Sequence, residues 1–479
     1  MKILRRLEKS RQFWFLIFTS FLFFILRLPS LFEPLWYGDE GIYQVIGTSL
    51  NHGKLLYSQI FDNKPPLLYW LYAIFQSDQF AIRLASLIFG ALAIIMFFFL
   101  SKKLFENTSK NNKIAFLTTF IFAVLFALPI LEGNIANAEN FMLLPIIASA
   151  FLIISQKSFF IAGLILGLAF LFKIVAVFDL GAFLAFCFIL NFTSLKNELK
   201  LFKIIEGFLI PVLLVALFFT FNGALIDFLR ATLISNISYV SYGNKIGNLP
   251  LLLFLKLVLL GGFLLFALAK REKLNQTTLF TSVWFAFSLF NAFFSQRPYT
   301  HYLLVLIPNL SLMIGLIFYD KKNQKTIAVF FIIALLAITK TFGIPNFNRG
   351  ISYYQNFLSY VADKKTTTSY QAFFDRNTPF DYEIARFIKP KLDIHDTIFI
   401  WGNNAQLYQL VGVVAPTKYV VAYHISNYKD GTITTQAGIE KTKPKFVVIM
   451  TNSGPLPFPL LNYSLKININ NATIYERLF

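Results

Sequence analysis

Runs of apolar residues long enough to cross a lipid bilayer recur along this 479-residue chain, and they constrain its fold more than any other feature. A membrane-spanning helix needs about 20 predominantly apolar residues. The chain has about eleven such runs, and 56% of its residues are hydrophobic, more than a soluble domain of this length can bury. We therefore predict an α-helical polytopic membrane protein, with spans near residues 12–29, 79–100, 113–130, 139–155, 159–173, 175–191, 204–221, 249–269, 277–295, 302–319 and 326–343.

The excess of basic residues fixes the predicted topology. In a soluble protein, a net charge of +19 would suggest that the protein binds nucleic acid. Here, however, the basic residues lie in short loops between apolar runs, as the positive-inside rule describes for membrane proteins. We expect membrane lipids as partners and no nucleic acid. The apolar run after the N-terminus has no small-residue cleavage site before Arg27, so we interpret it as an uncleaved first span. The N-terminus is then cytoplasmic, together with Lys102, Lys103, Lys157, Lys200, Lys270 and Lys321.

This topology places residues 30–78 in the first external loop. Within it, 38–50 and 65–75 have compositions compatible with helices, but they are too short or too polar to span a bilayer. We predict helices that lie in the membrane interface. Pro65 and Pro66 suit the first turn of the second helix, where a missing N–H costs nothing.

The composition changes after residue 343. Long apolar runs stop, and β-rich segments at 397–401, 418–422 and 446–450 alternate with helix-like segments at 381–388 and 404–410. The alternation predicts a small α/β domain outside the membrane, residues 344–479, following a membrane domain of residues 1–343. The single cysteine cannot form an intramolecular disulfide.

The first external loop contains groups suited to chemistry. Adjacent acids such as Asp39 and Glu40 are usually solvated, but partial desolvation at a membrane surface can turn one of them into a usable base. Asp62 and Lys64 follow, just ahead of the second helix. A lysine at a helix N-terminus favours phosphate binding, although it can equally contact lipid headgroups. The loop therefore offers a base and an anion-binding group together.

Other polar residues lie at the predicted external ends of spans. Glu139 opens a span, where it is either a site residue or a partner of the helix dipole. Arg297 can bind a phosphate bidentately or contact headgroups. His301, followed by Tyr302, is a candidate base or metal ligand, although a lone histidine is usually a hydrogen-bonded structural group.

Lys173 lies inside an apolar run, where a charge is costly and therefore points to function. If its span begins near Phe159, the lysine arrives close to the external face. We predict that Lys64, Lys173 and Arg297 together bind a phosphate, with Asp179 as an alternative structural partner of Lys173.

These residues carry a resemblance to a known family. The segments WYGDEGIY from Trp36 and GKLLYSQIFDNKPPLLYW from Gly53 resemble membrane glycosyltransferases of the GT-C fold. The resemblance is to the protein O-mannosyltransferase and aminoarabinose transferase group and its bacterial members in glycosyltransferase family 39. Glu139, the run ending at Lys173 and the segment that begins at Arg297 are similar to the same group. The likeness covers roughly the membrane part of the chain.

The resemblance implies transfer of a hexose or pentose, with inversion, from a polyprenyl-phosphate-linked donor to a glycan, lipid or protein acceptor. The reaction would occur on the outer face of a bacterial cytoplasmic membrane. Asp39 would be the base, supported by Glu40, and Lys64 would bind the donor phosphate. In the aminoarabinose transferases a glutamate precedes that lysine and helps to bind metal, whereas this chain has Asn63 there. We expect no certain cofactor and leave a divalent metal open.

Two other functions fit a polytopic chain. One is a transporter or flippase of lipid-linked saccharides, which usually has ionisable groups near the middle of broken helices. The other is a non-catalytic protein of envelope glycan assembly, whose external domain does the work. The charges at the external span ends and the acid pair in the first loop favour the enzyme over both.

Overall fold

The computed structural model divides the chain into two compact units. The helical unit comprises Met1–Leu28, Ala85–Phe218 and Leu233–Gly350, and the loop–sheet unit comprises Pro29–Leu84, Phe219–Thr232 and Ile351–Phe479. The structure describes residues 10–107, 111–190, 195–245, 251–343, 346–470 and 472–478. The predicted domain boundary at residue 344 lies outside these ranges, as does most of the basic N-terminus, whose cytoplasmic side stays a prediction.

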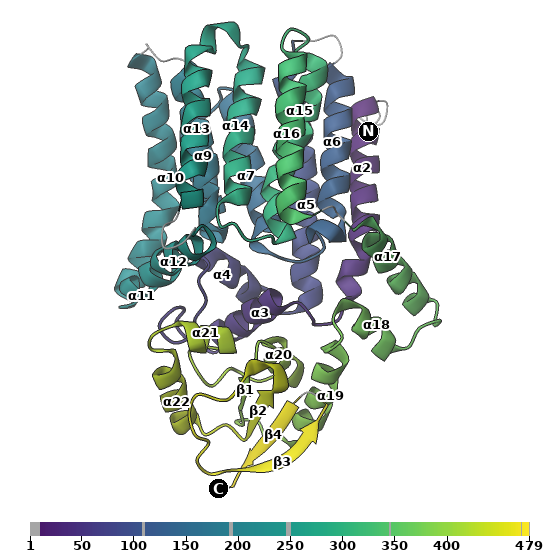
Figure 1. Ribbon diagram of the computed structural model, residues 1–479, viewed down its shortest axis with the longest axis vertical. Helices are drawn as coiled ribbons and strands as arrows, with labels where there is room; N and C mark the ends of the chain where they lie inside the picture. Colours follow the sequence, from purple (N-terminus) through teal and green to yellow (C-terminus); the bar gives the residue numbers. More distant parts are fainter. Residues whose placement is uncertain are drawn as a thin grey trace, which may run out of the picture. The chain divides into compact units, whose positions relative to one another are not determined.

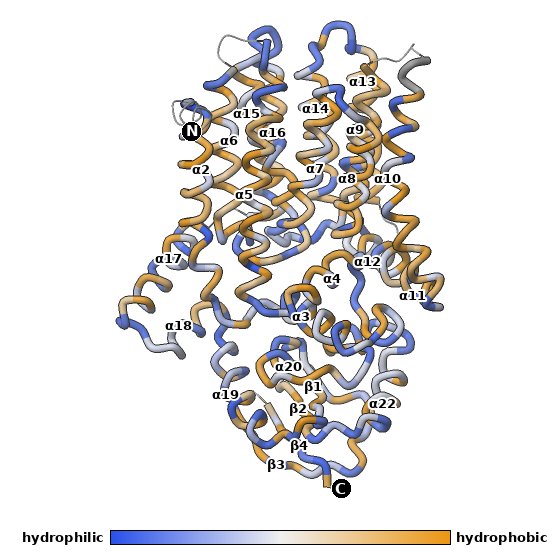
Figure 2. The backbone as a smooth tube through the Cα atoms, turned by 180° about the vertical axis from the view of Figure 1, so that it is seen from behind, coloured by the Kyte–Doolittle hydropathy of each residue, from blue (hydrophilic) through white to orange (hydrophobic). Residues whose placement is uncertain are grey.

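Apolar helices occupy every range in which we predicted a span (Figure 1). Figure 2 shows them as largely hydrophobic tubes with polar ends. By length and apolar composition, six of the helical segments described can cross a membrane, and four more are apolar but shorter. The number that do cross stays a prediction. The helices are α2 (Arg11–Arg27), α5 (Gln79–Leu104), α6 (Asn111–Ala127), α7 (Ala138–Ile154), α8 (Phe159–Phe172), α9 (Val177–Leu190), α10 (Leu195–Phe221), α13 (Leu251–Ala269), α14 (Gln276–Phe293), α15 (Ile307–Tyr319) and α16 (Gln324–Phe342).

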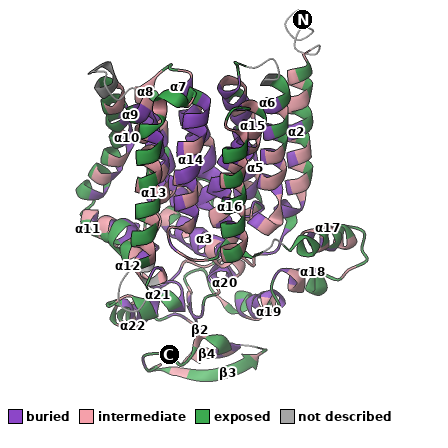
Figure 3. Cartoon of the chain, turned by 45° about the horizontal axis from the view of Figure 1, so that its top comes forward, coloured by how far each residue is buried: buried purple, intermediate pink, exposed green. Residues whose placement is uncertain are grey.

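Packing within the helical unit relies on small residues and buried helices. α7 packs on α8, and α14 packs on both α9 and α15. Gly163 and Gly167 of α8 let α10 approach closely, since a Cβ on Gly163 would lie 2.1 Å from the carbonyl oxygen of Ile204. Figure 3 shows α14 mostly buried, whereas α13 and α16 expose one side. The exposed residues of α13 and α16 include Leu259 and Leu336, which is the pattern expected of lipid-facing helices.

Residues 30–78, the predicted first external loop, contain two short helices, as predicted. α3 spans Gly38–Asn51 and α4 spans Pro66–Ile74, with a proline in its first turn. The two helices pack on each other, and the contact is close at Gly47, where a Cβ would lie 3.0 Å from the backbone of Tyr72 and Ala73. Both helices belong to the loop–sheet unit, together with the C-terminal residues.

The C-terminal part is the predicted α/β domain, built on one four-stranded sheet of order β1-β2-β4-β3 (Figure 1). β1 and β2 are parallel, and the other two pairs are antiparallel. The predicted strands at 397–401 and 446–450 are confirmed. β3 and β4 were not predicted, because polar residues interrupt the apolar residues in both segments. The strands are β1 (Ile398–Trp401), β2 (Phe446–Met450), β3 (Tyr463–Ile469) and β4 (Ala472–Arg477), and the helices are α17 (Phe347–Val361), α18 (Thr367–Phe374), α19 (Thr378–Ile388), α20 (Gln406–Val411), α21 (Ala422–Asn427) and α22 (Gly431–Thr442).

The prediction of a strand at residues 418–422 is wrong. This segment is buried for the most part, as its apolar composition requires, but it joins no strand ladder. Its backbone bonds elsewhere: the carbonyl of Lys418 accepts from the amide of Phe61 at 3.0 Å, and the amide of Ala422 donates to the carbonyl of Gly402 at 2.8 Å. Buried backbone N–H and C=O groups require hydrogen-bond partners, and here Phe61, in the predicted first external loop, supplies one of them.

Candidate functional site

Lys64 is the centre of a cluster of charges in the loop–sheet unit. Its Nζ lies 3.5 Å from Oδ2 of Asp39 and 3.5 Å from Oδ2 of Asp62. The ammonium also lies 4.8 Å from the ring centroid of Tyr43, within range of a cation–π contact. Asp39 is in the first turn of α3, and Lys64 directly precedes the prolines that open α4. Packing of α3 on α4 thus brings together residues separated by 25 positions.

Three tyrosines hold this cluster in place. Tyr43, one helical turn after Asp39, donates to Oδ2 of Asp39 at 3.0 Å. Tyr69 donates to Oδ2 of Asp62 at 2.6 Å, and Tyr57 donates to the carbonyl of Lys64 at 2.7 Å. Burial, reinforced by the charge of Asp62, raises the pKa of Tyr57 and Tyr69 well above the usual value. Both phenols therefore stay protonated and act as donors at neutral pH.

The two carboxylates differ in their access to solvent. The Asp39 side chain is 37% exposed, that of Lys64 is 17% exposed and that of Asp62 is only 2% exposed. Asp39 is therefore the carboxylate that a substrate can reach. Asp62 instead anchors the lysine from the buried side.

Glu40 pairs with Arg83, whereas the neighbouring Asp39 contacts Lys64. The buried Arg83 lies between two buried carboxylates: it bonds Glu40 through two nitrogens and contacts Oε2 of Glu33 at 2.9 Å. Glu33 also accepts from Tyr353 at 2.6 Å and from Trp36 at 2.8 Å. This arrangement fixes the start of α3 to the segment before it. Glu33 and Arg83 were not predicted as site residues, although an arginine within an apolar run is a signal of the same kind as Lys173.

A second cluster lies in the helical unit. Lys173 forms an ion pair with Glu139, and its Nζ lies 4.8 Å from the ring centroid of Tyr302. His301 lies between two glutamates, with Nδ1 at 2.9 Å from Glu132 and Nε2 at 4.0 Å from Glu139. Lys173 interrupts the helical backbone between α8 and a 3-10 turn at Ile174–Ala176. The prediction that Asp179 is an alternative partner of Lys173 is wrong, because the Asp179 carboxylate accepts a hydrogen bond from Trp284 at 2.7 Å instead.

The three cations predicted to bind phosphate are divided between the units. Lys64 belongs to the loop–sheet unit, whereas Lys173 and Arg297 belong to the helical unit. Arg297 is half-buried beside the end of α12 (Ser235–Gly243), with its Nε 3.7 Å from the place of a Cβ on Gly243. The convergence of the three cations stays a prediction.

Whether a divalent metal binds to the charged clusters stays a prediction. Among the residues described, no group of three or more His, Cys, Asp and Glu side chains is placed to hold one. The two ring nitrogens of His301 face different glutamates, and the contact with Glu132 is short enough for a hydrogen bond. In the first cluster, the ammonium of Lys64 contacts both carboxylates.

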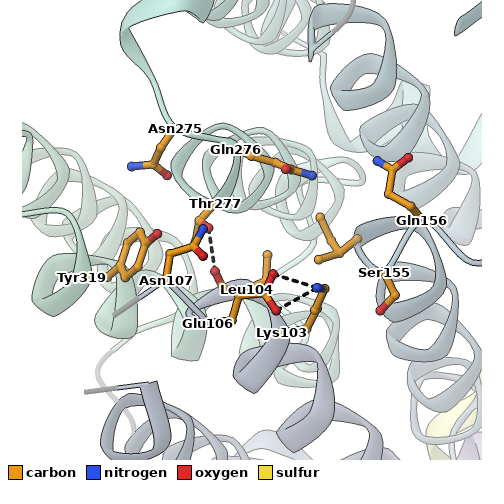
Figure 4. Close-up of a pocket in the computed structure, with 11 residues that line it drawn as sticks. Lys103, Leu104, Glu106, Asn107, Ser155, Gln156, Asn275, Gln276, Thr277 and Tyr319 are labelled. Carbon is orange, nitrogen blue, oxygen red and sulfur yellow. Dashed lines mark hydrogen bonds and ion pairs between the residues drawn. The ribbon is translucent and has the colours of Figure 1, made fainter. Parts of the chain in front are cut away.

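A polar pocket of about 220 Å³ lies elsewhere in the helical unit (Figure 4). Its walls come from the ends of α5, α7 and α15 and the start of α14. Lys103 and Glu106 form an ion pair within it, at 2.7 Å, and Thr277 donates to the carbonyl of Leu104 at 2.6 Å. None of the candidate site residues lines this pocket.

Comparison with known proteins agrees with the resemblance. Residues 63–221, about a third of the chain, match the family described as dolichyl-phosphate-mannose-protein mannosyltransferase. This match includes Lys64, Glu139 and Lys173. No curated protein sequence matches the chain.

The structure is similar to crystal structures of ArnT from Cupriavidus metallidurans. For ArnT bound to undecaprenyl phosphate, the TM-score is 0.56 at 14% identity, over 97% of this chain and 98% of that one. For the apo state the TM-score is 0.59 at 13% identity, over the same shares. ArnT has the GT-C fold. The chain is thus a multi-pass membrane protein with the GT-C fold of membrane glycosyltransferases, as its sequence predicted.

Proposed function

We propose that this protein transfers a sugar from a polyprenyl-phosphate-linked donor to an acceptor, with inversion at the anomeric carbon. The observation that carries the proposal is the pairing of an accessible Asp39 with Lys64 at 3.5 Å, at the start of the two helices of the first external loop. The family match begins at Asn63 and so includes that lysine, and the similar ArnT structure contains undecaprenyl phosphate. The sugar is a hexose or pentose, and the acceptor is a glycan, a lipid or a protein.

Asp39 is the proposed base. Inverting transfer to a hydroxyl requires a carboxylate within hydrogen-bond reach of the acceptor proton. Asp39 is the most exposed carboxylate of its cluster, and Tyr43 holds one of its oxygens at 3.0 Å. The acceptor hydroxyl would approach the exposed side of this carboxylate and give up its proton as the oxygen attacks the sugar. Glu40 supports Asp39 indirectly, by fixing the start of α3 through Arg83.

Lys64 is the proposed phosphate-binding residue. Its ammonium contacts the buried Asp62 on one side and the accessible Asp39 on the other. A donor phosphate would take over part of the contact with Asp39, while Asp62 keeps the lysine in place. The phosphate leaves with its negative charge, and a cation beside it stabilises that charge as it develops.

Lys173 and Arg297 are proposed as further phosphate-binding residues, with Glu139, His301 and Tyr302 as further residues of the substrate site. Lys173 is held by Glu139 and packs over Tyr302, so its ammonium has a fixed position. We also propose that the protein resides in a bacterial cytoplasmic membrane. Its N-terminus would be cytoplasmic and residues 344–479 external.

Mass spectrometry of cells with and without the gene tests the function. Loss of the gene should remove one sugar from the cellular glycans, lipids or proteins and cause its polyprenyl-phosphate-linked form to accumulate. An Asp39→Asn gene should fail to restore the sugar, and an Asp363→Asn gene, altered at an exposed aspartate of the same unit, should restore it. Full restoration by Asp39→Asn, or a lipid-linked sugar that accumulates only on the cytoplasmic face, would favour a transporter instead.

A further inference from the structure

His424 brings the C-terminal domain into contact with the Lys64 cluster. Its Nε2, on the short helix α21, lies 3.6 Å from Oδ1 of Asp62. The other oxygen of Asp62 accepts from Tyr69 at 2.6 Å and lies 3.5 Å from Nζ of Lys64. Both side chains are buried, that of His424 being 3% and that of Asp62 2% exposed. One buried carboxylate thus divides its two oxygens between a histidine and the lysine.

The character of this contact follows from the chemistry of the two groups. Burial lowers the pKa of His424 to about 4, although the nearby Asp62 raises it, so the ring is neutral at pH 7. A neutral imidazole has one N–H, and an ionised carboxylate only accepts. Because Nδ1 has no hydrogen-bond partner in the part of the chain that the structure describes, Nε2 is the atom through which the ring can hold Asp62.

Neighbouring aromatic residues fix the position of the histidine ring. It packs edge-on against Phe61, the residue before Asp62, with ring centroids 5.5 Å apart, and against Tyr423 and Tyr428. The amide of Phe61 also donates to the carbonyl of Lys418. The segment from Lys418 to His424 therefore holds the backbone at Phe61 as well as the side chain of Asp62.

We infer that His424 is a positioning residue of the donor site, and that the C-terminal domain completes this site. His424 orients Asp62, and Asp62 fixes the ammonium of Lys64 where the donor phosphate binds. A lysine has a long side chain with many rotamers, so the position of its charge depends on its partners. The inference rests on the proposed function, because it assigns Lys64 to the phosphate.

Binding of undecaprenyl phosphate to the full-length protein in detergent tests the inference, with native mass spectrometry as the measurement. His424→Phe keeps a buried ring but removes the ring nitrogen that lies 3.6 Å from Asp62, and should raise the Kd about tenfold, the loss expected for one polar contact to a charged group. His424→Gln keeps an N–H near the same place and should recover part of that loss. His395→Phe, at an exposed histidine of the same domain, is the matched control and should bind like the wild type.

A double substitution separates positioning from a general loss of structure. If His424 acts through Asp62, adding His424→Phe to Asp62→Asn should change the Kd less than twofold, because the two effects share one path. A full tenfold loss in that background, or wild-type affinity in His424→Phe, would overturn the inference. If His424→Phe does not fold, the same cycle with His424→Gln decides. Should Lys64→Gln bind undecaprenyl phosphate as well as the wild type, the proposed function fails; if only the His424 variants are unchanged, the failure concerns this inference alone.

Discussion

Gly41 of α3 lies directly against Gln406 of α20, so closely that a Cβ on the glycine would be 2.7 Å from the amide nitrogen of Gln406. The helix that carries Asp39 is therefore packed against a helix of the C-terminal domain without an intervening side chain. α20 is in turn fastened to α19, because Gln406 donates to Asp381 at 2.8 Å. The loop that contains the proposed base and the domain that follows the last span thus form one packed structure.

Gly41→Ala should destabilise this contact. The added methyl group meets backbone atoms that cannot move aside independently, and overpacking of this kind costs about 1–3 kcal/mol. The thermal unfolding temperature of the purified protein should fall, and sugar transfer should fall with it. Gly262→Ala is the control, because a Cβ there meets no described atom within 4 Å. Equal unfolding temperatures for the two variants would show that α3 and α20 are not closely packed.

Asp39→Asn should abolish transfer while leaving the fold intact. The substitution preserves shape and removes basicity, and general base catalysis typically contributes about 10²–10⁴-fold to the rate. Turnover should fall by that factor, measured with a lipid-linked donor, while binding of undecaprenyl phosphate stays near the wild-type value. Near-normal turnover in Asp39→Asn, combined with an inactive Glu40→Gln or Glu139→Gln, would assign the base to another carboxylate.

Lys64→Gln should weaken use of the donor. One charged contact to a phosphate in a partly dry site is worth about 2–4 kcal/mol in the transition state. We expect kcat/KM for the donor to fall accordingly. Lys429→Gln, at an exposed lysine of the same unit, should leave kcat/KM unchanged. The assignment of Lys64 is wrong if the two variants behave alike.

Arg83→Met should destabilise the protein strongly, because it leaves the buried carboxylates of Glu33 and Glu40 without their shared partner. Removing one partner of a buried ion pair lowers the free energy of unfolding by about 3–5 kcal/mol. Glu33→Gln and Glu40→Gln added to the same protein remove the uncompensated charges and should recover part of the loss. Thermal unfolding of the single and triple variants measures this, and a triple variant less stable than Arg83→Met would contradict it.

The dependence of stability on pH should reveal two buried groups with opposite effects. Burial lowers the pKa of His424 from 6.5 to about 4. The unfolded chain therefore binds a proton more readily than the folded one, and the free energy of unfolding falls as the pH decreases from 6.5 to 4. Burial raises the pKa of Asp381 from 3.8 to about 6, so folding is favoured as the pH falls from 6 to 4. At about 1.4 kcal/mol per pKa unit, each effect amounts to about 3 kcal/mol.

The two effects should nearly cancel in the wild-type protein between pH 6.5 and 4. Asp381→Asn should remove one of them, so that this variant loses stability on acidification, whereas His424→Gln should gain stability over the same range. Thermal unfolding at several pH values measures both slopes. Parallel curves for the two variants would show that at least one of these groups is not buried as described.

The sequence by itself determined the class of the protein, the positions of its apolar helices and the two short helices of the first external loop. These features follow from local composition: apolar runs of membrane length, prolines at a helix start and an adjacent acid pair. It also predicted β1 and β2, since buried parallel strands consist of continuous apolar residues, as in Phe446–Met450. The polar alternation of β3 gave no such signal.

Only the tertiary structure decided how the charges are shared. The sequence placed Asp39 beside Glu40, yet α3 turns one carboxylate toward Lys64 and the other toward the buried Arg83. No local pattern predicts the contact between Asp62 and His424, because the two residues are separated by more than three hundred positions. In the sequence, a lone histidine in an apolar segment does not by itself indicate a functional site. It gains significance here because burial makes each polar atom depend on the partners that packing brings to it.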